Sequence, residues 1–324
     1  MPTNHHDTGY KELFSYPEFV QQLIEGFAPP EIAELMDFRT LKNHSGHYIT
    51  PLFEEKFEDV VWSVMINREG RCQQVFLYIL LEFQSTVDRA MPIRLMHYVA
   101  CFYDHLLKTK ATTPGGGLPP VFPVVLYNGS QRWTAEQDVY DMVQPEPPGF
   151  LRAYQPHLRY YLVDEGRYSD EELGLRQTPL SGVFSVENAG QSWEALQQAV
   201  DRVVAIIQAD PNKDRTDRII TRWLKRHLSR LGAEIHLDQL DSLVGDKDML
   251  AENLENLVKK ERLEGLEEGL EKGLEKGLER GQREAREETA RNLISRTEMN
   301  DKMIAEIAGL PLDEVSALRS KIKH

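Results

Sequence analysis

The sequence of 324 residues is poor in cysteine and has no long apolar run. Its two cysteines, Cys72 and Cys101, exclude a disulfide framework and fit a reducing compartment. The longest purely apolar run, Val75–Leu81, is far too short to span a bilayer. The first residues, MPTNHHDTGY, lack the basic region and apolar stretch of a secretory signal peptide. We therefore expect a cytoplasmic protein that does not contact a membrane.

Positive charge is also scarce, because 38 Lys and Arg stand against 52 Asp and Glu and give a net charge of −14. A protein that coats nucleic acid needs many basic residues to displace counterions, so that class is disfavoured. Part of the imbalance is concentrated in residues 251–290, which hold 12 acidic and 8 basic side chains. Any contact with DNA must then be local, with a metal ion or a small basic patch offsetting the repulsion.

What the sequence does contain is the pattern of a mixed protein of helices and strands, with 41% apolar residues. Helical spacing over residues 7–27 predicts one helix that bends at Tyr16-Pro17, or two short helices. The segments FEDVVWSVMI and CQQVFLYILLEFQ, separated by NREGR, predict a β-hairpin, and an additional strand begins near Tyr48 in one interpretation.

Further elements are predicted after the hairpin. The stretch STVDRAMPIRLMHYVACFYDHLLK indicates a helix with Pro92 in its first turn. VFPVVLYNGS indicates a strand that closes in an Asn-Gly turn, HLRYYLVDE indicates another strand, and the pattern from Ser192 onward is helical. This order predicts an α/β or α+β protein, with a mixed sheet flanked by helices and a helical C-terminal extension.

The end of the apolar strand, LYILLEFQS at 77–85, is the most informative stretch. Because side chains alternate along a strand, Glu82 and Gln84 share one face and Phe83 points to the other. Facing residues of the hairpin sum to 141 or 139, for a two-residue turn at Gly70-Arg71 or at Glu69-Gly70. Either register places Asp59 across from Glu82 or diagonal to it, about 4.5–8 Å away.

Two carboxylates at that separation repel each other unless a cation lies between them or one is protonated. Carboxylates, a backbone carbonyl and waters suit Mg²⁺, and other divalent ions are open alternatives. Such an ion can polarise a phosphodiester and orient a water nucleophile. The amide of Gln84 can hydrogen-bond that water or a phosphoryl oxygen. The pattern therefore predicts a metal site formed by Asp59 and Glu82, with Gln84 beside it.

Asp59, the Glu82-Phe83-Gln84 triplet, Asp88 and the segment MPIRLMHY together resemble the Rpn/YhgA-like recombination-promoting nucleases of the PD-(D/E)XK superfamily. The segments HDTGYKELF and PVVLYNG are similar as well, and the repetitive Gly-Glu-Lys tail matches in style. The resemblance implies a PD-(D/E)XK nuclease-like fold and a metal-dependent DNA endonuclease that promotes recombination. It also implies that Asp59 and Glu82 bind the metal, and that Gln84 takes the place of the lysine usual in the superfamily.

Two further residues are candidates for this site. Arg94, on the helix after Gln84, could contact a phosphate, and its alternative is a salt bridge with an acidic neighbour. Glu12, on the first helix, is a weaker candidate for an extra acidic ligand.

A second hypothesis keeps the nuclease fold without efficient catalysis. Net acidity and the missing lysine favour a weak or inactive binding and oligomerisation module, whereas the paired carboxylates favour the enzyme. A transposase in the strict sense would need longer DNA-recognition elements than the sequence offers. A serine-hydrolase elbow and a phosphate-binding glycine loop are absent. His97, Cys101 and His105 recur every four residues, but one straight helix rarely closes a zinc site from three such positions.

We expect residues 1–240 to form the nuclease-like domain, 241–296 a charged repeat helix or linker, and 297–324 a small helical hairpin. The repeat LEGLEEGLEKGLEKGLERG at 263–281 places glycine and leucine every four residues, a step that advances about 40° beyond a full turn. Each interior glycine costs about 0.8–1 kcal/mol of helix stability. We expect a solvated linker helix in preference to a coiled coil, with a homo-oligomer through this C-terminal region left open.

The last segment, NDKMIAEIAGLPLDEVSALRSKI, predicts two short helices around Gly309-Leu310-Pro311. A helix-turn-helix has this outline, but Asp313 and Glu314 would face DNA phosphates at the start of the second helix. A packing or oligomerisation unit is therefore expected in preference to a DNA reader.

Overall fold

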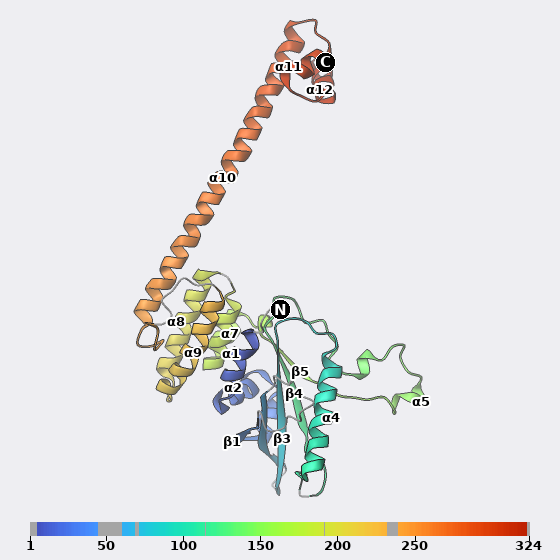
Figure 1. The fold of residues 1–324 in the computed structure, drawn as a ribbon, viewed down its shortest axis with the longest axis vertical. Helices are drawn as coiled ribbons and strands as arrows, with labels where there is room; N and C mark the ends of the chain where they lie inside the picture. Colours follow the sequence, from blue (N-terminus) through green and yellow to red (C-terminus); the bar gives the residue numbers. More distant parts are fainter. Residues whose placement is uncertain are drawn as a thin grey trace. The chain divides into compact units, whose positions relative to one another are not determined.

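A computed structural model describes residues 5–44, 60–68, 71–113, 115–190, 192–231 and 239–322 of the chain. The chain divides into two compact units, residues 1–257 and 258–324. The first unit contains a five-stranded sheet in the order β1-β2-β3-β4-β5 (Figure 1). Its strands are β1 (Met36–Asn43), β2 (Val60–Arg68), β3 (Arg71–Gln84), β4 (Val121–Tyr127) and β5 (Tyr161–Asp164).

The sheet is mixed, because β1, β2 and β3 pair antiparallel while β3, β4 and β5 pair parallel. β3 is the longest strand and lies in the middle of the sheet, with an antiparallel neighbour on one side and a parallel one on the other. This arrangement confirms the predicted mixed sheet flanked by helices.

The β2–β3 hairpin contains both of the registers considered from the sequence. Pairs from Val60↔Leu81 to Ile66↔Val75 sum to 141, whereas Arg68↔Arg71, nearest the hairpin end, sums to 139. A register shift between Ile66 and Arg68 connects the two, because residues 72–74 of β3 lie opposite residue 67 of β2, an irregularity of the β-bulge kind.

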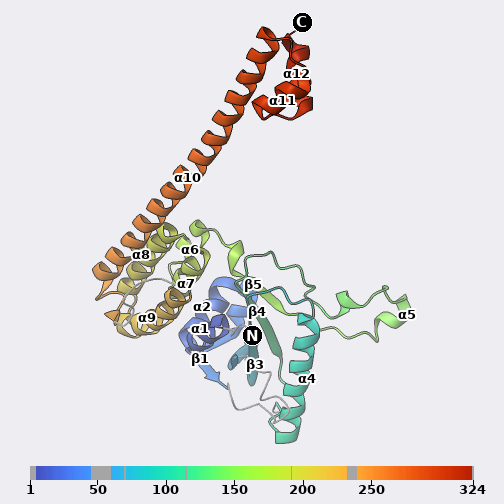
Figure 2. The same ribbon diagram turned by 45° about the horizontal axis from the view of Figure 1, so that its top comes forward.

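The two faces of β3 contribute to different cores. Leu81 and Phe83 belong to the main core, and Phe83 lies 5.9 Å and 5.6 Å from the stacked rings of Tyr10 and Phe14. Figure 2 shows the N-terminal helices and α4 on opposite faces of the sheet. α4 (Met91–Thr109) buries Met91, Leu95, Tyr98 and Val99 in a smaller core with Val125 of β4. Glu82 and Gln84, which alternate with Phe83, therefore face α4.

The N-terminal region differs in part from the sequence prediction. It forms two helices, α1 (His5–Leu13) and α2 (Pro17–Phe27), because Pro17 opens the second helix after an extended Tyr16. A short α3 (Pro30–Leu35) then leads directly into β1, a strand the sequence analysis missed. The strand considered near Tyr48 lies outside the described residues.

The elements after the hairpin agree with the prediction. Pro92 stands in the first turn of α4, and both later strands are present as β4 and β5. Asn128 does not close a hairpin, since its N–H donates to the carbonyl of Gln84 at 3.1 Å and β5 runs parallel to β4. The connection from β4 to β5 carries η1 (Tyr140–Met142) and α5 (Gly149–Arg152).

The main core is completed by helices that follow β5. These are η2 (Glu165–Arg167), α6 (Asp170–Arg176), α7 (Pro179–Asn188), α8 (Trp193–Ala209) and α9 (Lys213–Arg230). Capping boxes begin two of them, with Ser169 and Glu172 at α6 and Thr178 and Ser181 at α7.

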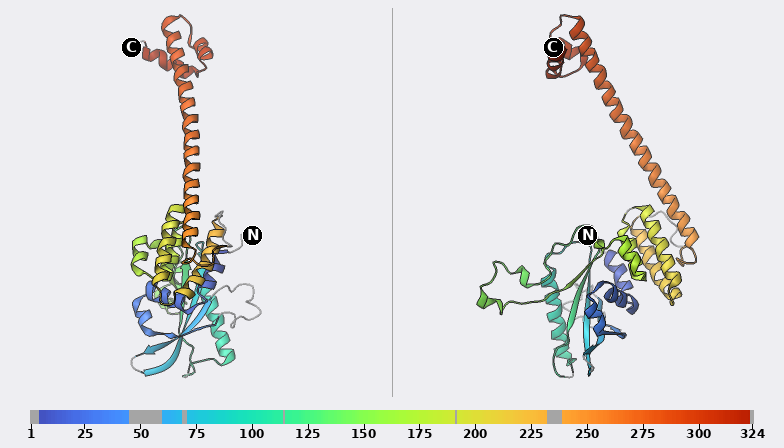
Figure 3. Two further views of the ribbon diagram at one scale, coloured as in Figure 1. Left: turned by 90° about the vertical axis from the view of Figure 1, so that its left-hand side faces the viewer. Right: turned by 180° about the vertical axis from the view of Figure 1, so that it is seen from behind.

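The second unit is entirely helical. The glycine-rich repeat lies within one unbroken helix, α10 (Lys247–Arg296), whose first turns belong to the first unit (Figure 3). α11 (Asp301–Ala308) and α12 (Leu312–Ile322) pack on the end of α10 around Ile294, Ile304 and Val315. Gly309 adopts φ +64° between them, a left-handed conformation that glycine adopts without strain. Among the described helices, none is long and apolar enough to cross a membrane.

Candidate functional site

Glu82 is a buried carboxylate near the end of β3, with only 4% of its side chain exposed. One of its oxygens, Oε1, accepts hydrogen bonds from Arg94 Nη2 at 2.6 Å and from Gln84 Nε2 at 2.8 Å. The predicted glutamate and glutamine are therefore in direct contact on one face of the strand, where alternation placed them.

Arg94 connects this strand end to α4. Its guanidinium contacts Glu82 through Nη2 and Asp88 through Nη1, the latter at 2.8 Å, and Nη2 also donates to Tyr98 Oη at 3.2 Å. About 37% of the Arg94 side chain remains exposed. The predicted salt bridge with an acidic neighbour is present, and the arginine also lies at the candidate site.

The charge of Arg94 is held firmly. Burial alone would lower the pKa of this guanidinium, but the attraction of Glu82 and the hydrogen bonds with Asp88 and Tyr98 raise the pKa well above its ordinary value. A fixed positive charge therefore stands beside Glu82 at all accessible pH values. Such a guanidinium can contact a phosphate oxygen with its remaining N–H groups.

The second oxygen of Glu82 is the feature most relevant to metal binding. Oε2 is buried and has no hydrogen-bond partner among the described residues. A buried carboxylate oxygen without a partner is costly, and an unassigned cation is one explanation for it. One monodentate carboxylate oxygen is an appropriate ligand for a hard divalent ion.

Asp59, the other predicted ligand, lies outside the described residues. The described part of the chain contains no group of three His, Cys, Asp or Glu side chains that could hold a metal by itself. His97 and Cys101 on α4 form no such group either, although their Nε2 and Sγ atoms are 3.9 Å apart. The pairing of Asp59 with Glu82 therefore stays a prediction.

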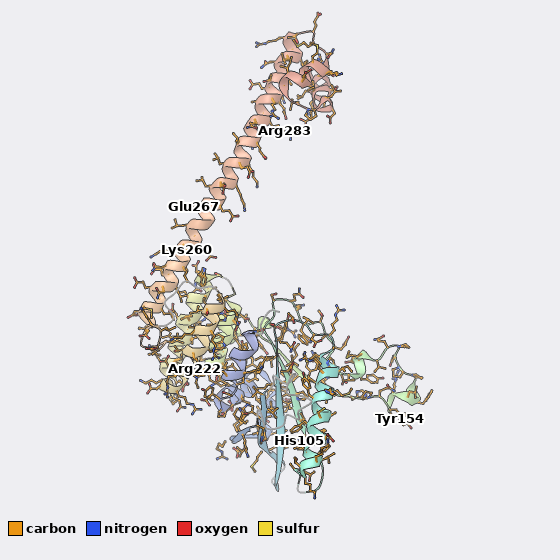
Figure 4. All side chains as sticks on the ribbon, viewed as in Figure 1. His105, Tyr154, Arg222, Lys260, Glu267 and Arg283 are labelled. Carbon is orange, nitrogen blue, oxygen red and sulfur yellow. The ribbon has the colours of Figure 1, made fainter. Side chains whose placement is uncertain are left out.

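Glu12 is engaged elsewhere. Its carboxylate pairs with Arg222 at 2.7 Å and with Arg226, both on α9 (Figure 4 labels Arg222). Its helix, α1, packs on the Phe83 face of the sheet, opposite the face of Glu82. The structure does not bring Glu12 to the candidate metal site.

A second polar cluster, which the sequence analysis missed, lies on the helical side of the sheet. Tyr10 donates to Glu165 Oε2 at 2.7 Å, and both residues are fully buried. Burial, reinforced by Glu187, raises the pKa of Glu165 well above its ordinary value, so this carboxyl binds a proton tightly. Burial and the neighbouring Glu165 likewise raise the pKa of Tyr10.

The same cluster extends to α9. Arg230 pairs with Glu187 at 3.0 Å, and its Nη2 lies 2.7 Å from His227 Nδ1. Glu187, His227 and Arg230 line a cavity of about 800 Å³ together with Ser85 and Gly129, which follow β3 and β4. No local sequence pattern indicates this cluster, because contacting members such as Tyr10 and Glu165 lie 155 residues apart along the chain.

Fold and site together define an α/β protein with a nuclease-like mixed sheet, whose central strand ends in a buried acid beside an amide and an arginine. The family model described as "Putative transposase, YhgA-like" matches residues 4–217, well over half of the chain. The chain therefore belongs to the YhgA-like family.

Several curated proteins are similar over part of the chain. Recombination-promoting nuclease RpnD of Escherichia coli O157:H7 is 29% identical over 126 residues, which cover 39% of this chain and 46% of the relative. Recombination-promoting nuclease RpnA of Escherichia coli K12 is 30% identical over 125 residues, 38% of this chain and 40% of the relative. The chain thus spans less than half the length of either relative.

A further relative is named differently. Inactive recombination-promoting nuclease-like protein RpnE of Escherichia coli K12 is 27% identical over 125 residues, which cover 38% of this chain and 39% of the relative. The chain is thus similar to nucleases and to a protein named inactive. No solved structure matches it significantly.

Proposed function

We propose that this chain is a Mg²⁺-dependent DNA endonuclease of the PD-(D/E)XK type, which hydrolyses phosphodiester bonds in the cytoplasm and promotes recombination. The observation that carries the proposal is the buried Glu82, with one oxygen bonded to Gln84 and Arg94 and the other without a partner among the described residues. The names of RpnD and RpnA support the reaction class.

The described register supports Asp59 as the second ligand. Val60 pairs with Leu81, so continuing this register by one residue would set Asp59 opposite Glu82. Val61 packs in the α4 core, and residues two apart on a strand share a face. We therefore propose that Asp59 and Glu82 hold Mg²⁺ between them. A bound Mg²⁺ would polarise the phosphodiester and lower the pKa of a coordinated water.

The protein groups around this carboxylate have separate roles in the proposal. Arg94 supplies a permanent positive charge that attracts a phosphate and offsets the net negative charge of the chain. Gln84 holds the orientation of Glu82 through its amide nitrogen, and its carbonyl oxygen can accept a hydrogen bond from the attacking water. Asp88 fixes the guanidinium from the far side.

Plasmid nicking with Mg²⁺, Mn²⁺ or Ca²⁺ tests the proposal. We expect the parent to nick, and Glu82→Gln and Asp59→Asn to reduce the rate more than about 100-fold, because changes around metal ligands already cost about 10–100-fold. Asp104→Asn is the matched control, since this exposed carboxylate on α4 pairs with Lys108 of its own helix. Retention of nicking by both site variants would refute the assigned site.

A specific observation favours the alternative of a weak or inactive module. Arg94 already neutralises Glu82 at 2.6 Å, and the similar RpnE is named inactive. Under this alternative none of the three ions supports nicking by the parent, yet calorimetry still detects DNA binding, and this binding weakens in Arg94→Met. The inactive-module alternative would be excluded if the parent nicks DNA and Glu82→Gln abolishes this activity.

A further inference from the structure

The middle of α10 presents a leucine stripe to solvent. Leu266, Leu270, Leu274 and Leu278 are 69%, 74%, 74% and 62% exposed. Leucines exposed in series on one helix are unusual in a monomer, where scattered single apolar residues are the norm. Five glycines, Gly265 to Gly281, run beside the stripe at the same four-residue interval, and a Cβ added to any of them would meet nothing within 4 Å.

The repeat divides this part of the helix into four columns. Residues four apart form one column, which winds slowly around the helix. Four such columns share the circumference, so neighbouring columns lie about 90° apart. Leucines occupy one column, and the next holds Glu267, Glu271, Glu275 and Glu279. The third, opposite the leucines, holds Glu268 and then Lys272, Lys276 and Arg280, and the fourth holds the glycines. Figure 4 shows side chains such as Glu267 projecting freely from this helix.

We propose that α10 pairs with α10 of a second copy of this chain, in parallel orientation and in register, through the leucine and glycine columns. The helix is complementary to a second copy of itself. A two-fold axis parallel to the helices brings the leucine column of one copy onto the glycine column of the other, so that large side chains fill the space left by small ones.

Charge complementarity selects the orientation. In the parallel pair the glutamate column beside the leucines of one copy approaches the basic column beside the glycines of the other. An antiparallel pair would bring glutamates against glutamates and basic residues against basic residues, which is unfavourable. Lys272 and Arg280 remain 64% and 82% exposed while paired with Glu268 and Glu284 of their own helix, so they are accessible to a second helix.

The repeat also determines the sense of winding. A heptad repeat has 3.5 residues per turn and gives a left-handed supercoil, whereas repeats above 3.6 give a right-handed one. The four-residue repeat therefore gives a right-handed supercoil, in which the two helices pair along the stripe from Leu266 to Leu278 and do not form a long heptad seam.

Analytical ultracentrifugation of the full chain tests the association. We expect the parent to sediment as a dimer, and the quadruple variant with alanine at the four stripe leucines to sediment as a monomer. Alanine keeps the helix, and circular dichroism verifies this. The control Leu107→Ala with Leu175→Ala removes two exposed leucines of α4 and α6, outside the repeat, and is expected to stay dimeric. A monomeric parent, or a dimeric quadruple variant, would overturn the proposal.

Cysteine cross-linking tests the orientation. In a background with Cys72→Ser and Cys101→Ser, we expect Leu266→Cys, Leu270→Cys and Leu278→Cys each to form a disulfide with its own copy. Identical positions meet all along a parallel pair, whereas in an antiparallel pair at most one of them does. Lys276→Cys, on the opposite column, is expected to remain reduced. Cross-linking at one position alone, or at none, would contradict the parallel arrangement.

Charge reversal provides a measurement that does not depend on leucine packing. We expect Glu271→Lys, Glu275→Lys and Glu279→Lys together to weaken dimerisation more than about tenfold, which corresponds to 1.4 kcal/mol. A chain with Lys272→Glu, Lys276→Glu and Arg280→Glu should restore association when mixed with it. Failure of the mixture to form the heterodimer would refute the proposed contact between the two columns. Nuclease activity is not a readout in any of these experiments.

Discussion

Arg94 and Glu82 form the contact on which the candidate site depends at the scale of single residues. Glu82 is almost fully buried, so its carboxylate relies on Arg94 and Gln84 for compensation of its charge. Removing one partner of such a pair leaves an uncompensated buried charge, whereas removing both relieves the penalty.

We therefore predict that Arg94→Met lowers the free energy of unfolding by about 1–3 kcal/mol, the cost of leaving a buried polar group without its partner. The double variant Arg94→Met with Glu82→Gln should recover part of this loss. Urea unfolding of the parent, both single variants and the double variant measures the coupling. Strictly additive effects would show that the ion pair contributes nothing to stability.

Glu165 makes a prediction about pH. Its folded-state pKa is raised by burial, so the folded protein holds this proton more tightly than the unfolded chain does. The resulting stability is fully present below the unfolded pKa of about 4.3 and is lost as the pH rises toward the folded value.

The amide introduced by Glu165→Gln has no acidic proton, so its contribution to stability does not change with pH. We predict that the variant becomes progressively more stable relative to the parent as the pH rises from about 5 to about 8. Urea unfolding at several pH values in that range measures the difference in the free energy of unfolding. Glu172→Gln is a suitable control, because this exposed carboxylate has a lowered pKa from its hydrogen bonds with Ser169 and titrates below the range. A difference between variant and parent that does not change with pH would contradict the prediction.

At the scale of elements, the packing of α7 on α8 depends on a glycine. A Cβ at Gly182 would lie 2.8 Å from Val203 Cγ2, which is closer than real side chains approach. A Cβ added to Gly174, in the interior of α6, would have no atom within 4 Å.

We predict opposite effects for these two glycines. Gly182→Ala should destabilise by about 1–3 kcal/mol through overpacking, whereas Gly174→Ala should stabilise by up to about 1 kcal/mol through helix propensity. Thermal and urea unfolding of the two variants measures both. Equal shifts of the same sign would show that propensity, and not the α7–α8 contact, decides the outcome.

Elements with a strong local signal could be predicted from the sequence. β3 has a long apolar run, α4 has Pro92 in its first turn, and facing residue numbers narrowed the hairpin to two registers. β1 could not be predicted, because MDFRTLKN carries a polar or charged residue at most positions and only Met36 is buried. The bulge after Ile66 has no local signature either, so both registers remained open.

The candidate site shows the same division. Alternation along β3 predicted that Glu82 and Gln84 meet, and sequence proximity made Arg94 a candidate. The contact between Tyr10 and Glu165 depends on how distant elements pack, which no local pattern encodes. The position of Asp59 stays a prediction, because it lies outside the described residues.

At the scale of the whole molecule, α10 begins in one compact unit and continues into the other. Leu250, Leu254 and Leu257 on its first turns are buried in the main core. The glycine repeat that follows is exposed and makes no such contribution.

We therefore predict that a chain ending at Leu257 folds and unfolds like the first unit of the full-length protein. A chain ending at Asp246 loses the three leucines and should be destabilised by more than about 3 kcal/mol, since each buried Leu→Ala already costs about 2–5 kcal/mol. Urea midpoints of the two fragments measure the difference. Equal midpoints would place the boundary of the folding unit before α10.

The central position of β3 has a consequence for how the protein opens. Its amides and carbonyls bond to β2 on one side and β4 on the other, while the outer strands β1 and β5 each have one neighbour in the sheet. Fraying that begins at the sheet edges therefore reaches the strand of Glu82 last. Hydrogen–deuterium exchange should find the slowest-exchanging amides around residues 79–83. A protease or a mild denaturant would therefore attack the edge strands before it unfolds the strand that holds the acidic centre.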